Sequence, residues 1–100
     1  MRIINENPNG KVLGYICYTD DELSERAYHQ LMAFECDSIY VDKEFVSVES
    51  LEELKKILSK IKNGDSVLIF GLASLSPTDA LRIIELIENS GATALTFALL

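Results

Sequence analysis

The chain has 100 residues, of which 48% are hydrophobic, and a formal net charge of −7 from sixteen acidic and nine basic side chains. This length suits one domain with a modest hydrophobic core. The acidic balance argues against DNA binding by this domain alone, because affinity for DNA depends mainly on cationic side chains that neutralise phosphates.

The cysteine and histidine content limits the redox and metal chemistry. Cys17 and Cys36 fit reduced thiols of a cytoplasmic protein better than a disulfide scaffold. One histidine and no CxxC pair cannot supply the ligands of a tetrahedral zinc site, so we expect neither a metal nor a cofactor. The sequence shows no apolar leader after Met1 and no apolar run of membrane-spanning length, so we expect no membrane association.

The first half of the chain predicts a strand, a helix and a second strand. Residues 1–10 end in the turn signature Asn-Pro-Asn-Gly and are expected to form a flexible lead-in. A β-rich apolar run over 11–18 predicts the first strand. Residues 22–34 follow helical spacing with one apolar face, and residues 38–42 predict a short second strand.

A second helix and a third strand follow. Ser50 and Glu53 have the spacing of a capping box, in which each side chain bonds an orphan backbone amide, so Ser50 is expected to open the helix. Asn63-Gly64 is expected to end it. Residues 66–70 are nearly all apolar, which predicts a central strand buried on both faces.

The last elements complete an α/β pattern. Ser76 is expected to cap a third helix that begins at Pro77 and ends at about Asn89. Residues 92–100 alternate in polarity and predict a final strand. The order β-α-β-α-β-α-β predicts a single three-layer α/β/α domain over residues 11–100, with a central, mostly parallel sheet.

The loops that follow the first and third strands are the expected place for chemistry, because open α/β sheets bind ligands outside the carboxyl ends of their strands. These loops are residues 14–22 and 70–77. Neither contains an arginine, a lysine or a histidine. They carry apolar, hydroxyl and acidic side chains instead, which is an unusual set for a catalytic site.

The frame around the two loops resembles the N-terminal catalytic domain of serine recombinases, the resolvases and invertases. The matching pieces, in order, are Gly14-Tyr15 followed by Thr-Asp-Asp-Glu, Cys36-Asp37 before a short strand, Asn63-Gly64-Asp65 before an apolar strand, and leucines at 72 and 75. The resemblance spans roughly residues 12–97. It implies a resolvase-like fold. In this family, a serine attacks a DNA phosphodiester.

The resemblance also implies where the catalytic groups should lie, and this sequence differs at each position. The family's first-strand arginine falls on Cys17 and its nucleophilic serine on Thr19, although another alignment deletes the nucleophile segment. The aspartate and the arginine of its third-strand motif fall on Ala73 and Ser74, and a following arginine falls on Pro77.

These replacements predict a loss of recombinase chemistry. Phosphoryl transfer depends on positioning and on positive charge around the phosphoryl oxygens, which arginine supplies as a planar, permanently charged fork. Acidic residues 20–22 would repel a phosphate. Cys17, without a cationic neighbour in sequence, is expected to be a structural thiol, and Tyr15 is expected to pack with its hydroxyl near water.

Three functional hypotheses remain. The first is a catalytically inactive, recombinase-like domain with a regulatory or protein-interaction role in DNA recombination or bacterial mobile elements, which associates with itself, for example as a homodimer, or with a protein partner. The second is a small anion- or ligand-binding domain, with Ser74, Ser76 and Thr78 offering hydroxyls at a helix start, although ordinary capping would use the same residues. The third is a weakly active site-specific recombinase with Thr19 as nucleophile.

Overall fold

The computed structural model describes residues 10–17 and 19–99, and it confirms the predicted α/β class and element order. The strands are β1 (Val12–Cys17), β2 (Ser38–Asp42), β3 (Ser66–Phe70) and β4 (Thr93–Thr96). The helices are α1 (Asp21–Ala33), α2 (Glu52–Lys60) and α3 (Pro77–Asn89), with short 3-10 helices η1 (Val48–Ser50) and η2 (Leu72–Ser74). The predicted lead-in, apart from Gly10, lies outside the described residues.

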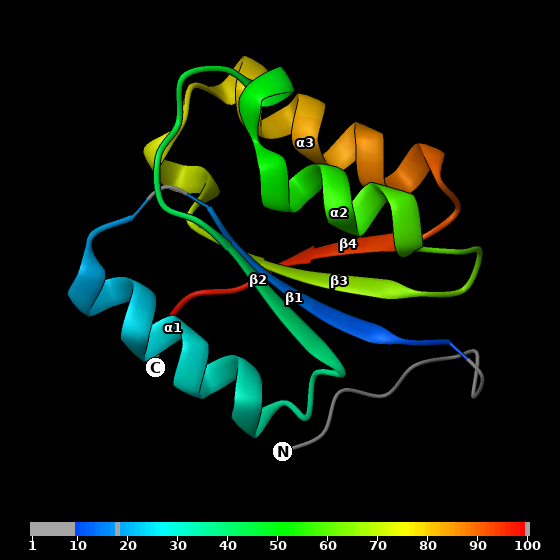
Figure 1. Ribbon diagram of the computed structural model, residues 1–100, viewed down its shortest axis with the longest axis horizontal. Helices are drawn as coiled ribbons and strands as arrows, with labels where there is room; N and C mark the ends of the chain where they lie inside the picture. Colours follow the sequence, from blue (N-terminus) through cyan, green and yellow to red (C-terminus); the bar gives the residue numbers. More distant parts are fainter. Residues whose placement is uncertain (1–9, 18, 100) are drawn as a thin grey trace.

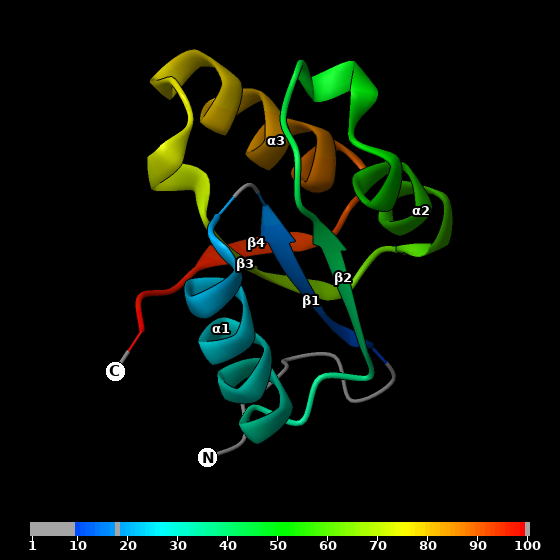
Figure 2. The ribbon, with the colours of Figure 1, turned by 60° about the vertical axis from the view of Figure 1, so that its left-hand side comes forward.

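The four strands form one sheet in the order β2-β1-β3-β4, and every neighbouring pair is parallel. Helix α1 covers one face of the sheet, whereas α2 and α3 cover the other (Figures 1 and 2). The three predicted layers are therefore present. Each crossover helix returns the chain to the amino end of the sheet, so all strands point the same way.

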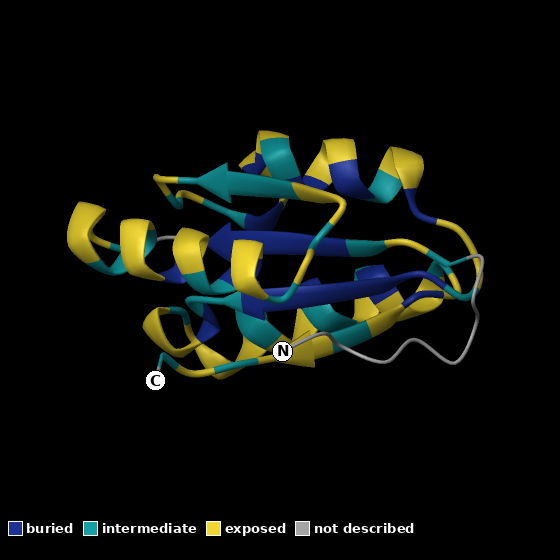
Figure 3. Cartoon of the chain, turned by 90° about the horizontal axis from the view of Figure 1, so that it is seen from below, coloured by how far each residue is buried: buried dark blue, intermediate teal, exposed yellow. Residues whose placement is uncertain are grey.

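The core has two unequal halves. The larger half lies between the sheet and α2 and α3, and the smaller half lies between the sheet and α1. The central strands β1 and β3 are buried along most of their length (Figure 3), as predicted for β3. Gly14 allows α1 to approach β1 closely, because a Cβ there would lie 2.8 Å from Cδ1 of Leu31.

The final strand is shorter than predicted. Strand β4 ends at Thr96, although the amide of Phe97 still donates to the carbonyl oxygen of Ile69 in β3 at 3.1 Å, and residues 98–99 run on toward α1 (Figure 1). There, Nε2 of Gln30 donates a hydrogen bond to the carbonyl oxygen of Ala98 at 3.2 Å. Phe97 and Leu99 pack against the smaller core half. The end of the chain therefore adds apolar side chains to the α1 face of the sheet.

The predicted cap of α2 is wrong, although the helix begins only two residues after Ser50. The Ser50 hydroxyl belongs to η1, where it accepts from the amide of Ser47 and donates to the Ser47 carbonyl oxygen. The amides of Glu53 and Leu54 instead donate to the carboxylate of Asp42, each at 3.1 Å. A carboxylate at the end of β2 thus caps a helix that begins ten residues later in the chain.

The predictions for the end of α2 and the start of α3 agree better. Helix α2 ends at Lys60, before the expected Asn63-Gly64 stop, and Gly64 adopts a φ of 94° in the turn that follows. Helix α3 has Ser76 as its cap and Pro77 as its first residue, as predicted. None of the helices in the described part of the chain is both long and apolar enough to cross a membrane.

Candidate functional site

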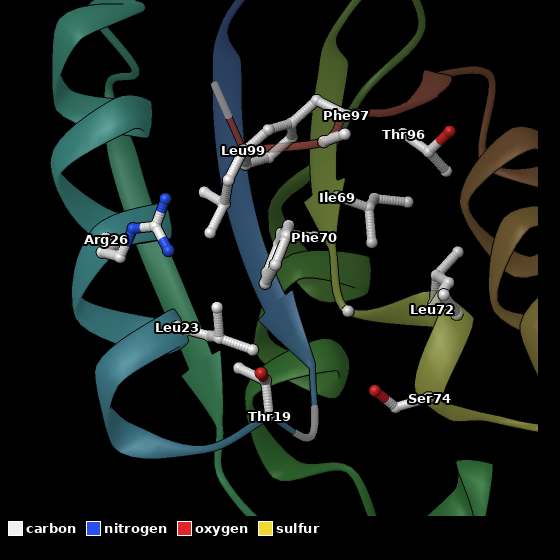
Figure 4. A pocket seen from close by; sticks show the side chains of 13 residues that line it. Thr19, Leu23, Arg26, Ile69, Phe70, Leu72, Ser74, Thr96, Phe97 and Leu99 are labelled. Carbon is white, nitrogen blue, oxygen red and sulfur yellow. The ribbon is translucent and has the colours of Figure 1, made fainter.

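A cavity of about 830 Å³ opens on the α1 side of the sheet, at the carboxyl end of β3. Four segments form its walls: the loop after β1, helix α1, helix η2 and the segment that follows β4 (Figure 4). This is the edge of an open α/β sheet at which ligands bind. The cavity therefore lies where the two loops predicted a functional site.

The cavity is mostly apolar, with polar groups at its margins. Phe70 lies at its centre, and Phe97 and Leu99 lie at one end (Figure 4). The rings of Phe70 and Phe97 have centroids 5.5 Å apart and are tilted by 40°. The hydroxyls of Thr19 and Ser74 lie at the opposite end of the cavity.

The structure brings together some of the positions onto which the resemblance places catalytic groups, but not all of them. Thr19, Ala73 and Ser74 line the cavity. Cys17 does not, because it is fully buried in the larger core half on the other face of the sheet. Pro77 also lies outside the lining, as the first residue of α3.

Cys17 belongs to a buried network that includes Tyr15 and Asp42. Burial raises the pKa of the Cys17 thiol to about 11, so the thiol is protonated at neutral pH and is a poor nucleophile. The Tyr15 hydroxyl donates to Oδ2 of Asp42 at 2.7 Å, and Tyr15 is fully buried. The expectation of a water-facing Tyr15 hydroxyl is therefore wrong.

The three hydroxyls expected to bind an anion do not converge on one place. Ser74 lines the cavity, but Ser76 and Thr78 do not. Ser76 Oγ accepts from the amide of Asp79 at 3.2 Å and donates to Oδ2 of Asp79 at 3.0 Å. Ser76 thus acts as a helix cap, and the carboxylate of Asp79 already lies at the positive end of the α3 dipole.

Arg26 lines the cavity but was not predicted from the two loops, because it lies in α1. It projects from α1, and its guanidinium lies above Leu23 on the wall of the cavity (Figure 4). Among residues 10–17 and 19–99 its guanidinium forms no ion pair, whereas Arg82 pairs with Glu49 at 2.6 Å. The available signal was its spacing: Arg26 follows Leu23 by three residues, which places both on one side of the helix.

The described part of the chain contains no group of three or more histidine, cysteine, aspartate or glutamate side chains arranged to hold a metal ion. Comparison with known protein families finds no family that matches this chain, and comparison with curated proteins finds no match. What is established is a small α/β domain with a four-stranded parallel sheet and an apolar cavity at the carboxyl ends of its strands.

Proposed function

We propose that the chain is a catalytically inactive, recombinase-like domain that has a regulatory or protein-interaction role in DNA recombination or mobile elements. One observation carries the proposal. The cavity lies where α/β sheets place their chemistry, yet its described lining has Thr19 and Ser74 beside an apolar floor and Arg26 as its one cationic side chain. A phosphoryl-transfer site needs several cationic donors around the phosphate.

The outer edge of β4 supports an interaction role. The sheet order places β4 at an edge, and its four residues, Thr-Ala-Leu-Thr, carry no charge. Leu95 shares the α1 face of the sheet with its register partner Leu68 and is 40% exposed. Edge strands without charges or prolines offer unpaired backbone groups to other chains, so β4 is the surface that we assign to association.

Sedimentation tests this assignment. We expect the wild-type domain at micromolar concentration to sediment as a dimer, or to co-sediment with the catalytic domain of an active serine recombinase. Leu95→Lys should weaken that association, because a charge on the edge blocks strand pairing. Leu81→Lys is the matched control, because Leu81 is also exposed, at 55%, but lies on α3.

Two results would count against the interaction role. One is a strictly monomeric chain that binds no recombinase domain at the highest concentration tested. The other is equal weakening by Leu95→Lys and Leu81→Lys, which would show that association does not use β4.

A cleavage assay tests the loss of chemistry. The domain is incubated at high concentration with supercoiled DNA, and covalent protein–DNA adducts are separated under denaturing conditions. We expect no adduct. An adduct that forms with the wild type and disappears in Thr19→Ala would identify a residual recombinase instead.

The cavity favours a second candidate function, ligand binding. Its volume of about 830 Å³ falls in the range of small-molecule sites, and its lining is largely apolar with a few polar groups, as such sites usually are. Binding of a small molecule in the cavity is compatible with a regulatory domain. If the cavity binds no molecule with an apolar body, whether its polar end is negative, neutral or positive, the ligand-binding function is excluded.

A further inference from the structure

We propose that the cavity binds a small amphipathic monocarboxylate, with Arg26 holding the carboxylate and the aromatic floor holding the apolar body. This inference rests on the second candidate function, ligand binding, and not on the interaction role of β4.

The apolar part of the site is preformed. Phe70, Phe97 and Phe34 make a continuous run of ring contacts: Phe34 meets Phe97 edge to face with centroids 5.9 Å apart, and Phe97 meets Phe70 at 5.5 Å. Leu23 and Leu99 flank Phe70 in the cavity (Figure 4). An alkyl or aryl body laid over Phe70 would bury apolar surface on both partners without rearranging these rings.

Arg26 supplies a positive group for the acid end of the ligand. Its guanidinium lies on the cavity wall and forms no ion pair with any residue that the structure describes. A guanidinium offers two parallel N–H donors to a carboxylate, which gives a strong and directional contact. Among the described residues that line the cavity, Arg26 is the one arginine or lysine, so it is the positive group that a ligand's acid end would meet.

The end of the cavity that carries the hydroxyls of Thr19 and Ser74 sets the orientation of the ligand. Asp20 lines a smaller hollow there, together with Thr19, Leu23 and Ser74. Its negative charge would repel the ligand's acid group, so the carboxylate belongs at Arg26. The apolar body then lies over Phe70 and extends toward Phe97 and Leu99, away from Asp20 (Figure 4).

The charge of the chain restricts the ligand to a monoanion. The net charge is −7, and a single guanidinium cannot offset the repulsion that a phosphate dianion or a nucleotide would meet. We therefore expect inorganic phosphate and nucleotides to bind much more weakly than a monocarboxylate of moderate length.

The test is a titration of the full chain with decanoate, kept below the concentration at which it forms micelles. Affinity is measured by calorimetry and the contact site by NMR shift changes. Decanol and decylamine have the same apolar body with a neutral and a positive end. We expect saturable decanoate binding, shift changes at Leu23, Phe70, Phe97 and Leu99, and weaker binding of decanol and especially decylamine.

Variants of two exposed arginines test whether the charge of Arg26 contributes to the affinity for decanoate. Arg26→Gln should lower the affinity for decanoate by about tenfold, the usual loss for one charge-assisted pair. Arg26→Lys should lower it less, because it retains the charge but not the fork. Arg82→Gln is the matched control and should leave the affinity unchanged, because Arg82 lies on α3 and pairs with Glu49. Melting curves establish that each variant is folded.

The possible failures are distinguishable. Equal affinities of decanoate, decanol and decylamine, or an Arg26→Gln variant that binds decanoate like the wild type, would overturn the monocarboxylate assignment while leaving an apolar ligand site in place. Absence of saturable binding by all three molecules, or shift changes confined to other surfaces, would overturn both this inference and the ligand-binding candidate. Neither result bears on association through β4.

Discussion

Asp42 accepts three hydrogen bonds, two from a helix and one from a neighbouring strand. Its carboxylate accepts from the backbone amides of Glu53 and Leu54 in the first turn of α2 and from the hydroxyl of Tyr15 on the neighbouring strand. The side chain therefore serves as the cap of α2 and as the partner of a buried phenol at the same time.

Removal of this carboxylate should destabilise the domain strongly. We expect Asp42→Ala to lower the free energy of unfolding by about 3 kcal/mol, because a helix cap is lost and a buried hydroxyl is left unpaired. Tyr15→Phe, which removes only one donor, should cost about 1 kcal/mol. Urea unfolding measures both. Glu44→Ala is the control at an exposed site, and a loss there as large as that of Asp42→Ala would contradict the capping role.

The two thiols should make the domain less stable in alkaline solution. Burial raises the pKa of Cys17 and of Cys36 from 9.0 to about 11. Between these values the unfolded chain releases thiol protons that the folded chain retains, so the free energy of unfolding falls as the pH rises above about 9. The slope for one group is at most about 1.4 kcal/mol per pH unit. Cys17→Ala should flatten the profile measured by urea unfolding from pH 8 to 11, and an unchanged profile would contradict a buried, protonated Cys17.

The same protonation predicts slow alkylation. At pH 8 a thiol with a pKa near 11 has about a hundredfold less thiolate than one with a pKa of 9.0. Cys17 is also fully buried, whereas Cys36 is partly exposed. Iodoacetamide should therefore modify Cys36 before Cys17 in the folded protein and both equally in urea. Preferential labelling of Cys17, measured by peptide mass spectrometry, would point to an activated thiol.

The turn between β3 and η2 depends on a close backbone contact. Gly71 has a φ of 107°, and a Cβ at this position would lie 1.9 Å from the carbonyl oxygen of Cys17 at the end of β1. The contact joins the two loops that border the cavity. A side chain here would require both a strained backbone and a displaced strand end.

Gly71→Ala should therefore lower the free energy of unfolding by at least about 2 kcal/mol. Gly91→Ala is the matched control: Gly91 also has a positive φ, of 89°, but a Cβ there would lie no closer than 3.1 Å to its nearest neighbour, Asn63. We expect a cost of about 1 kcal/mol for this control. Equal costs in chemical unfolding would show that the contact with Cys17 adds no constraint.

Across the whole domain, the two faces of the sheet are covered unequally. Two helices lie on one face, whereas on the other face α1 is joined by the short segment 97–99. Phe97 therefore completes the smaller core half and also forms a wall of the cavity. The incomplete cover on this face explains how a cavity and a partly exposed apolar edge can occur side by side.

The difference between Phe97 and Leu95 tests this arrangement. Both residues belong to the alternating apolar pattern, but Phe97 packs against the core and Leu95 is 40% exposed. Phe97→Ala should lower the free energy of unfolding by about 2 kcal/mol, and Leu95→Ala by less than about 1 kcal/mol. Thermal and urea unfolding measure the two losses, and the reverse order would contradict the packing of the segment on the α1 face.

Much of the fold was predictable because its signals are local. The bounds of β2 and β3 agree with the prediction residue for residue, and the Ser76-Pro77 start of α3 needs only neighbouring residues. Hydrophobic period, caps and turn residues act over a few positions. The position of the cavity follows from the same element order, since the loops after β1 and β3 must meet at one end of a parallel sheet.

Other features required the packed structure, because they join residues far apart in the chain. The sequence around Ser50 has a valid capping pattern, but the carboxylate of Asp42 approaches α2 only after β2 has paired with β1. Residues 98–99 could extend a strand, but the carbonyl oxygen of Ala98 accepts from Gln30 of α1 and Leu99 packs against the smaller core half. Arg26 reaches the cavity only because α1 packs beside β3 and the final segment. Local pattern thus determines which elements form and in what order, and long-range packing determines which side chains share a site.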